Sequence, residues 1–182
     1  MIIKVDSYLF VNCLNRNLEK NIIKFKNLSI IYHQDSKNSL NEIQMKTLIN
    51  FCKRKKIKFF FEDNIKLTTK YKADGLFLTS KNNKFYKNLN NKRILIIGSA
   101  HSQGEYFFKI NQGCKIVMLS PLFNNKKYSI NKTLGLNRFN LISRNWNCKI
   151  GALGGILKEN LNKIYSTKIK VIGFQRLINQ QL

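Results

Sequence analysis

"RILIIGSAHSQGEYFFKINQGCKIVMLSP", residues 93–121, carries one complete strand–helix–strand unit. The apolar run "ILIIG" is followed by Ser102 and Glu105, whose spacing is that of a capping box and predicts that a helix begins there. Gly113 stands where a glycine that ends a helix belongs, and a second apolar run, "KIVML", follows it. Both runs are continuously apolar rather than alternating, which is typical of parallel strands covered on both faces. The stretch therefore predicts a β-α-β unit of an α/β protein.

The same unit recurs along the chain. Eight short runs rich in β-branched or aromatic residues lie at 8–11, 28–33, 57–61, 75–78, 94–98, 115–119, 149–153 and 170–174. Between the second and third runs, another capping box begins at Ser39, and an apolar stripe at helical spacing follows it. After the seventh run, a further helical stripe begins at Leu157. Strands and helices are therefore expected to alternate throughout.

Eight strands that alternate with helices predict a compact, closed (β/α)₈ TIM barrel, formed by a single domain over residues 1–182. Dividing 182 residues among eight units leaves about 23 for each, enough for a strand of about 5, a helix of about 11 and two short loops. The alternative is a doubly wound open sheet. Its dinucleotide fingerprint, Gly-x-Gly-x-x-Gly after the first strand, is absent, so we favour the barrel.

The chain has 33 Lys and Arg against 9 Asp and Glu, a formal net charge of +24. Such a charge favours phosphate-bearing partners, from nucleic acid to small diphosphates. The lysines are spread over every segment among many Asn and Ile residues, however, as expected of an AT-rich genome. RNA binding is the alternative, but the sequence has no RNP-type aromatic motif. We therefore expect small phosphorylated substrates and no specific nucleic acid.

The four cysteines are scattered, with no Cys-x-x-Cys pair, so they indicate neither a zinc site nor a disulfide framework. We expect reduced, buried thiols. The apolar runs are far shorter than the roughly 18 residues that a membrane span needs, and the first residues lack the order of a signal peptide. The sequence therefore predicts a cytoplasmic protein without membrane contact.

In a barrel of this kind the chemistry belongs to the loops that follow the strands, with a phosphate site after strands seven and eight. Gly154 and Gly155 end the seventh run and are predicted to open a helix, where bare backbone N–H groups can approach a phosphate. Pro121, the only proline, is predicted to end the sixth strand and to direct the loop that follows. That loop, over residues 124–132, is basic and has the length of a functional lid.

Five motifs in this order and spacing resemble the thiamine phosphate synthase/TenI family of barrels. They are "KADGLFLTS" (72–80), "IIGSAHSQGE" (96–105), "LSPLFNNKK" (119–127), "LGLNRFNLI" (134–142) and "GALGGI" (151–156). The resemblance implies a synthase that joins hydroxymethylpyrimidine diphosphate to thiazole phosphate and releases pyrophosphate, with magnesium as cofactor. A catalytically degenerate member that binds a phosphorylated thiamine precursor is the alternative. A TenI-like thiazole tautomerase is disfavoured, because those members have a histidine where this chain has Pro121.

The resemblance also implies site residues. Ser99 matches the family serine that contacts the diphosphate, and Lys126 or Lys127 falls near the family's loop lysine, so these three residues are the predicted catalytic set. Asn125 falls at the place of a substrate-binding threonine. Gly155, and with it Gly154, matches the glycines that hold the thiazole phosphate.

The metal and diphosphate positions depart from the family pattern. Asp63 aligns with a magnesium ligand, but the second metal aspartate falls at Asn82, a neutral and weaker ligand. The cationic set that grips the diphosphate after strand two is replaced by "IYHQD". His33 and Gln34 are left as substitutes, and neither offers the fork of a guanidinium. The sequence leaves open whether this altered site is active, and it leaves the oligomeric state open.

Overall fold

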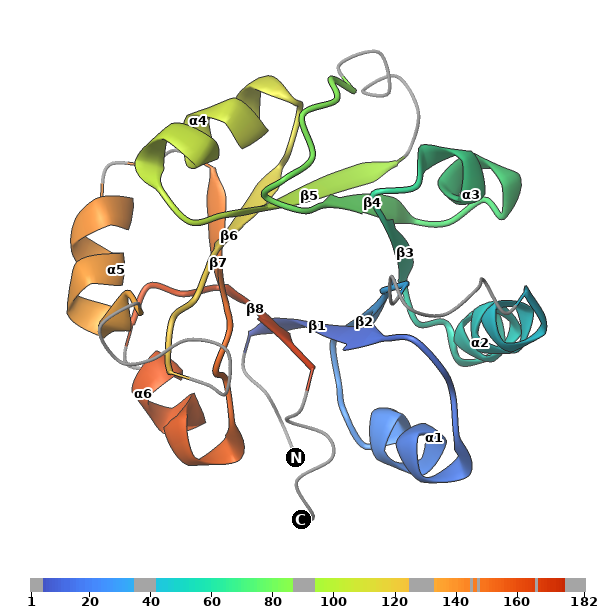
Figure 1. Cartoon of the computed structure of the whole chain (residues 1–182). Helices are drawn as coiled ribbons and strands as arrows, with labels where there is room; N and C mark the ends of the chain where they lie inside the picture. Colours follow the sequence, from blue (N-terminus) through green and yellow to red (C-terminus); the bar gives the residue numbers. More distant parts are fainter. Residues whose placement is uncertain are drawn as a thin grey trace.

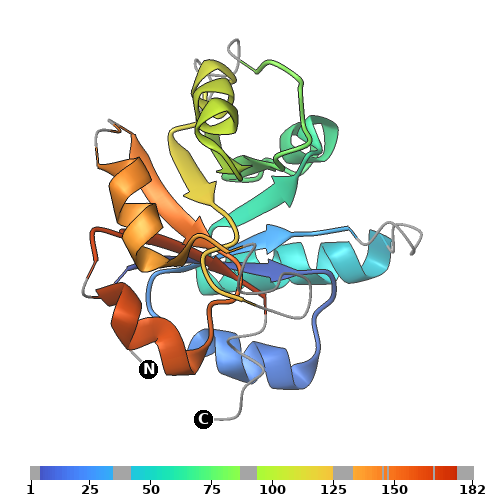
Figure 2. The same ribbon diagram turned by 60° about the vertical axis from the view of Figure 1, so that its left-hand side comes forward.

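The structure is a computed structural model that describes residues 5–34, 42–86, 94–124, 133–144, 146, 148–165 and 167–175. Eight parallel strands close into a barrel, in which each strand pairs with its neighbours in sequence and β8 pairs with β1. The helices lie outside the ring of strands (Figure 1), and the turned view shows the same arrangement (Figure 2). The prediction of a compact (β/α)₈ barrel is confirmed.

The elements lie close to the predicted runs. The strands are β1 (Asp6–Val11), β2 (Leu28–Tyr32), β3 (Phe59–Glu62), β4 (Gly75–Leu78), β5 (Leu95–Ala100), β6 (Ile116–Leu119), β7 (Lys149–Leu153) and β8 (Val171–Phe174). The helices are α1 (Arg16–Ile23), α2 (Glu42–Lys55), α3 (Ile65–Lys70), α4 (Gln103–Asn111), α5 (Gly135–Ser143), the 3₁₀ turn η3 (Lys158–Asn160) and α6 (Leu161–Tyr165). Among these described helices, none is long and apolar enough to span a membrane.

The two faces of the sheet build two separate apolar cores. The core inside the barrel contains Tyr8, Ile31, Phe60, Phe77, Ile97, Ile116, Met118 and Val171. Aromatic rings meet there edge to face, with centroids 5.4 Å apart for Tyr8 and Phe60 and 5.0 Å apart for Phe10 and Phe77. The intervening strand residues pack outward in the core that the helices share. This burial on both faces explains why the strands read as continuous apolar runs.

The sequence signals for α2 and α4 correspond to observed contacts. The stripe residues of α2 are buried, namely Met45, Leu48, Ile49 and Cys52. At α4 the Ser102 hydroxyl oxygen accepts a hydrogen bond from the Glu105 N–H at 3.2 Å, and Gly113 follows the helix at φ 94°. The carboxylate of Glu105 accepts from the N–H of His101 rather than of Ser102, so only half of the capping box forms as predicted. Ser39 lies outside the described residues.

The cysteines differ in their exposure, and this gives a testable prediction. Cys52 and Cys114 are buried, and burial raises the pKa of each thiol to about 12, whereas Cys13 is exposed. The expectation of buried thiols is therefore wrong for Cys13. A thiol reagent at about pH 8 is expected to label Cys13 quickly and to leave Cys52 and Cys114 unlabelled until the protein unfolds, because a neutral thiol is a poor nucleophile. Mass spectrometry of the labelled peptides measures this, and fast labelling of Cys52 in the folded protein would contradict the packing.

Candidate active site

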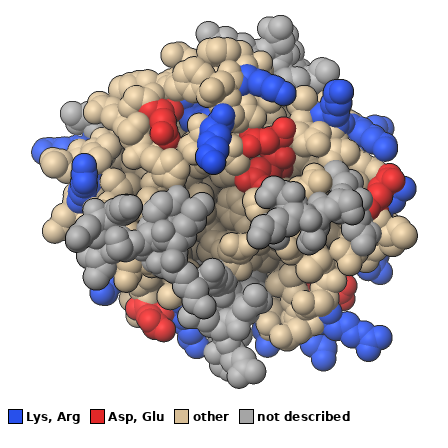
Figure 3. Space-filling view, in the orientation of Figure 1, with Lys and Arg blue, Asp and Glu red and all other residues tan. Residues whose placement is uncertain are grey.

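The carboxyl ends of the parallel strands meet at one end of the barrel, and polar residues follow the apolar interior there. His33, Glu62 and Ser99 each come two residues after a member of the interior core. Because side chains alternate between the two faces of a strand, all three are directed toward the barrel axis. The face drawn in Figure 3 is hollowed near its centre, and acidic side chains gather on the rim over β3 and β4. We call this end, marked by His33, Glu62 and Ser99, the barrel mouth.

Ser99 lies near the end of β5 and is 6% exposed. Its hydroxyl has no hydrogen-bond partner among the residues that the structure describes. The helix cap that a serine in this stretch could provide is made by Ser102 instead. As far as the described residues go, the Ser99 hydroxyl is therefore left for a ligand at the barrel mouth.

The structure brings together the two positions that align with metal ligands in the family pattern. Asp63 follows β3 in the left-handed region, at φ 49°, and its carboxylate accepts three hydrogen bonds. The donors are the side-chain amide of Asn82 (2.7 Å), the N–H of Thr79 (3.0 Å) and the hydroxyl of Thr79 (2.5 Å). The amide oxygen of Asn82 accepts from the N–H of Lys84 at 2.9 Å. Asn82 therefore meets Asp63 as a hydrogen-bond donor.

His33 and Glu62 pair at the barrel mouth. The Nδ1 atom of His33 contacts the carboxylate of Glu62, whose side chain is only 13% exposed. This contact engages the imidazole of His33, which is predicted to bind the diphosphate. It also places the negative charge of Glu62 beside that imidazole. Gln34, the other candidate from this segment, is exposed just beyond β2. Both residues stay predictions as substrate ligands.

Gly154 and Gly155 form a left-handed turn after β7, with φ values of 92° and 68°. A Cβ atom on Gly155 would overlap the loop that follows β6, since it would lie 2.6 Å from the carbonyl oxygen of Asn124. The N–H of Phe123 donates to the carbonyl of Gly154 at 3.1 Å and joins the two loops. The prediction that the glycines open a helix is wrong, because the helix begins only at Lys158, as a 3₁₀ turn.

The same turn leaves backbone N–H groups for a ligand. No described group accepts a hydrogen bond from the amides of Gly155 or Ile156. The carbonyl of Gly155 is held by the side-chain amide of Asn160 at 2.8 Å, and the amide oxygen of Asn160 accepts from the N–H of Leu157 at 3.0 Å. Successive amides in a fixed left-handed turn are a backbone arrangement that binds anions.

The sixth strand ends where Pro121 predicts. β6 stops at Leu119, and the loop beyond Pro121 is tied to β7 by the N–H of Leu122, which donates to the carbonyl of Leu153 at 2.9 Å. Three predicted site residues of this loop, Asn125, Lys126 and Lys127, lie outside the described residues.

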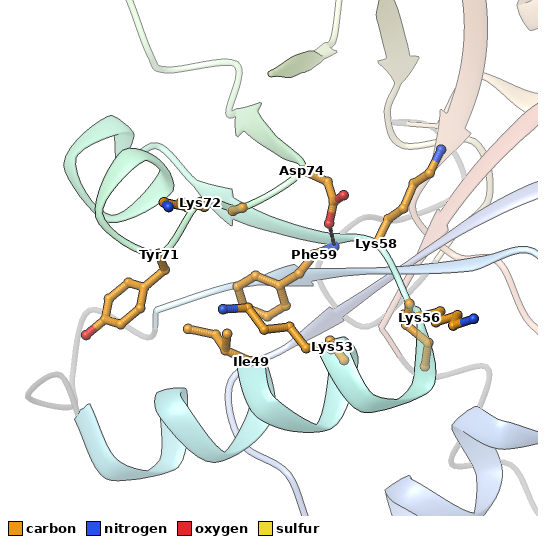
Figure 4. A pocket seen from close by; sticks show the side chains of 11 residues that line it. Ile49, Lys53, Lys56, Lys58, Phe59, Tyr71, Lys72 and Asp74 are labelled. Carbon is orange, nitrogen blue, oxygen red and sulfur yellow. Dashed lines mark hydrogen bonds between the residues drawn. The ribbon is translucent and has the colours of Figure 1, made fainter. Parts of the chain in front are cut away.

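A pocket of about 270 Å³ lies at the opposite end of the barrel, between the last turn of α2 and the segments that lead into β3 and β4 (Figure 4). The lysines around it are Lys53, Lys56, Lys58 and Lys72. Both α2 and α3 end here, so these cations lie near the negative ends of two helix dipoles. The carboxylate of Asp74 accepts from the N–H of Phe59 at 2.8 Å. The favourable interaction with the helix dipoles thus explains why lysines gather around this pocket. The pocket is separate from the barrel mouth.

Comparison with known proteins decides the family. The sequence matches the family described as thiamine monophosphate synthase over residues 13–178, which is most of the chain. The chain belongs to the thiamine monophosphate synthase family. Two curated proteins named thiamine-phosphate synthase are similar to it, at 29% identity over 130 residues in Prochlorococcus marinus and 30% over 137 residues in Flavobacterium psychrophilum. These matches cover 70% and 71% of this chain but only 37% and 66% of the relatives' own lengths.

A solved structure shares the fold of this thiamine monophosphate synthase family member. It is described as thiamine phosphate pyrophosphorylase from Pyrococcus furiosus and gives a TM-score of 0.74 at 16% sequence identity. The match covers 96% of this chain and 87% of that chain. It extends the agreement in fold to nearly the whole barrel.

Two features of this family member escaped the sequence analysis. Glu62 has no role in the motif-based predictions, although strand alternation from Phe60 predicts that it lies at the barrel mouth. Lys109 received no role, because a lysine in an amphipathic helix is expected to face solvent. It is instead fully buried behind the segment that carries Asn82.

Proposed function

We propose that this chain is a thiamine phosphate synthase-type transferase of thiamine biosynthesis, which joins hydroxymethylpyrimidine diphosphate to thiazole phosphate and releases pyrophosphate. The family match over residues 13–178 carries the proposal, and both curated relatives bear the name of that enzyme. The formal net charge of +24 supports it, because a strongly basic protein attracts phosphorylated substrates.

The thiazole phosphate is proposed to bind at the turn of Gly154 and Gly155. The amides of Gly155 and Ile156, which have no acceptor within the described ranges, would donate hydrogen bonds to its oxygens. The close approach of the loop after β6 to Gly155 supports this role, since it fixes the amides before a ligand arrives. A preformed set of donors avoids the entropic cost of ordering the turn on binding.

The diphosphate is proposed to bind beside the end of β5, where the Ser99 hydroxyl would donate to a phosphate oxygen. Lys126 and Lys127 would supply positive charge from the loop after β6, with Asn125 as a further donor. Such donors stabilise the leaving pyrophosphate as negative charge develops on it. His33 and Gln34 are proposed to complete the site as weaker ligands.

Magnesium is the cofactor that the family resemblance implies, and Asp63 is its predicted ligand. When bound, magnesium would neutralise charge on the diphosphate. It requires oxygen ligands in near-octahedral geometry, whereas Asn82 turns its NH₂ group toward Asp63, and three hydrogen bonds already use the carboxylate. The described residues therefore do not fit a two-carboxylate magnesium site, and no step of the reaction is assigned to the ion.

The direct test is an assay of the purified chain with the pyrimidine diphosphate and thiazole phosphate, with and without magnesium, in which both thiamine phosphate and pyrophosphate are measured. We expect both products in equal amounts. Pyrophosphate without thiamine phosphate would indicate hydrolysis of the diphosphate. The absence of both products would contradict the proposed activity.

A catalytically degenerate member that binds a phosphorylated thiamine precursor is the second candidate. Two contacts favour this candidate, because each weakens a binding site for a diphosphate with its metal ion. The side-chain amide of Asn82 donates to Asp63, and the carboxylate of Glu62 pairs with His33. This candidate predicts saturable binding of thiazole phosphate by calorimetry and no product in the assay. Product formation would exclude it.

Ser99→Ala separates a chemical role from a structural one. Since the Ser99 hydroxyl has no described partner, the substitution is expected to leave the melting temperature unchanged. It is expected to lower kcat/KM for the diphosphate roughly 10- to 100-fold, the cost of losing one hydrogen bond to a charged group. Ser102→Ala is the matched control: it removes the cap of α4 and lowers stability by about 1 kcal/mol, with kcat/KM retained. Equal kinetics in the two variants would contradict the role of Ser99.

A further inference from the structure

A charged side chain lies fully buried behind the segment that follows β4. Lys109, in α4, is 0% exposed. Its ammonium donates to the carbonyl oxygens of Thr79 (2.6 Å) and Asn82 (2.9 Å) and to the side-chain oxygen of Gln112 (2.9 Å). An ammonium group has three protons, so these contacts use every donor. All three partners are neutral oxygens.

The strand beneath makes room for the aliphatic part of Lys109. A Cβ atom on Gly98 of β5 would lie 3.0 Å from Cδ and 3.1 Å from Cγ of Lys109. The stem of the lysine therefore occupies the space above Gly98 and carries the ammonium to the loop. A buried cation without a carboxylate partner is costly, and an apolar side chain could fill the same space at lower cost. The contribution that distinguishes Lys109 from an apolar residue is therefore the set of three hydrogen bonds that its ammonium donates.

Gln112 extends the same contact from the end of α4. It is also 0% exposed, and its NH₂ group donates to the carbonyl oxygens of Asn82 (2.8 Å) and Lys84 (2.7 Å). Together Lys109 and Gln112 hold three carbonyl groups of residues 79–84. We call these two residues the α4 clamp.

The other side of residues 79–84 faces Asp63. The backbone carbonyls of Thr79 and Asn82 accept hydrogen bonds from the α4 clamp. The same two residues donate hydrogen bonds to the Asp63 carboxylate. The N–H of Asn82 also donates to the carbonyl of Thr79 at 3.0 Å, which closes the turn between them. The segment is therefore held by protein hydrogen bonds on both sides, from α4 and from the end of β3.

We propose that the α4 clamp is a positioning device that holds Thr79 and Asn82 against Asp63, so that this part of the barrel mouth forms without a divalent cation. The proposal rests on the proposed function in one respect, since it takes Asp63 as part of the diphosphate site. Lys109 does not touch the substrate and acts through residues 79–84. The side-chain amide of Asn82 lies against the Asp63 carboxylate, at a position where a cation would otherwise bind.

Residue-resolved hydrogen exchange of the full chain in EDTA tests the clamp. The amides of Thr79 and Lys84 donate to Asp63 and Asn82 respectively, so they report directly on the segment. Lys109→Met is expected to speed their exchange at least about tenfold, the factor for losing one hydrogen bond to a charged group. Lys66→Met, at an exposed position of α3, is the control and is expected to leave them unchanged. Equal exchange in the native chain and Lys109→Met would overturn the clamp.

Asn82→Asp tests the independence from metal and replaces Lys109→Met if that variant does not fold. The substitution sets a second carboxylate against Asp63, so in EDTA the amide of Thr79 is expected to exchange faster and magnesium is expected to restore its protection. In the native chain, added magnesium is expected to leave this exchange unchanged. Protection that appears in the native chain only with magnesium would overturn the proposal.

Binding of inorganic pyrophosphate, measured by calorimetry in EDTA, separates positioning from packing. Lys109→Met is expected to weaken it about tenfold and to leave thiazole phosphate binding unchanged, because the clamp acts only on the Asp63 side. Unchanged affinity for both ligands would reduce Lys109 to a packing residue and overturn the proposal. These readouts need no turnover, so failure of the synthase assay and failure of the clamp are distinguishable.

Discussion

Gly155→Ala is expected to destabilise the protein and to abolish thiazole phosphate binding. The residue has φ 68°, a region that costs an L-residue about 1–2 kcal/mol. Its new Cβ would also lie 2.6 Å from the carbonyl oxygen of Asn124, so the loops after β6 and β7 must move apart. We expect a loss of about 3 kcal/mol in the free energy of unfolding, the strain plus the cost of that displacement. Denaturant unfolding and calorimetric titration with thiazole phosphate measure the two effects.

Gly135→Ala is the matched control. Gly135 has a similar backbone conformation, at φ 63°, but a Cβ there would meet no atom within 4 Å. The control is therefore expected to cost only the conformational strain, about 1–2 kcal/mol, and to keep thiazole phosphate binding. Equal losses in the two variants would show that the approach of the loop to Gly155 has no energetic weight.

Asp63→Asn is expected to lower kcat/KM about 100-fold, because it releases Thr79 and Asn82 at the proposed diphosphate site, and to lower the free energy of unfolding by about 2 kcal/mol. The carboxylate of Asp63 accepts three hydrogen bonds, two of them from Thr79. An asparagine has one acceptor oxygen, and its NH₂ group would face a donor, so at least one of these bonds is lost. Steady-state kinetics and denaturant unfolding measure the two losses.

Asp74→Asn controls for the loss of a carboxylate as such. Asp74 also accepts a backbone N–H, that of Phe59 at 2.8 Å, but it lies at the opposite end of the barrel. This variant is expected to lose about 1 kcal/mol of stability and to keep its kcat/KM. If Asp63→Asn lowered stability alone and kept kcat/KM, the assignment of Asp63 to the diphosphate site would be wrong.

The acidic residues at the barrel mouth are paired with neighbouring side chains. Glu62 and Asp63 are two of only 9 acidic residues in the chain, and both lie at the end of β3. Each is engaged by a neighbouring side chain, His33 or Asn82. Among the described residues, both carboxylates at the end of β3 are therefore engaged by local partners, although the chain as a whole has a net charge of +24.

The sequence by itself determined the architecture. Each strand of a parallel barrel is buried on both faces, so its apolar run is visible without knowledge of its neighbours. Capping residues such as Ser102 act within one turn of helix and are equally local. For the same reason Ser99, Gly154 and Gly155 could be located from their motifs, since each lies in a fixed position relative to its own strand.

Only the tertiary structure decided what these residues contact. The pairing of His33 with Glu62 joins positions 29 residues apart, and the hydrogen bonds of Lys109 reach back 27 and 30 residues to Asn82 and Thr79. No periodicity records such contacts, because they depend on which loops close over which strand ends. The need for glycine at 155 likewise comes from the backbone of another loop. Local patterns fix elements, whereas side-chain partners and steric limits at the barrel mouth arise from packing between elements distant in sequence.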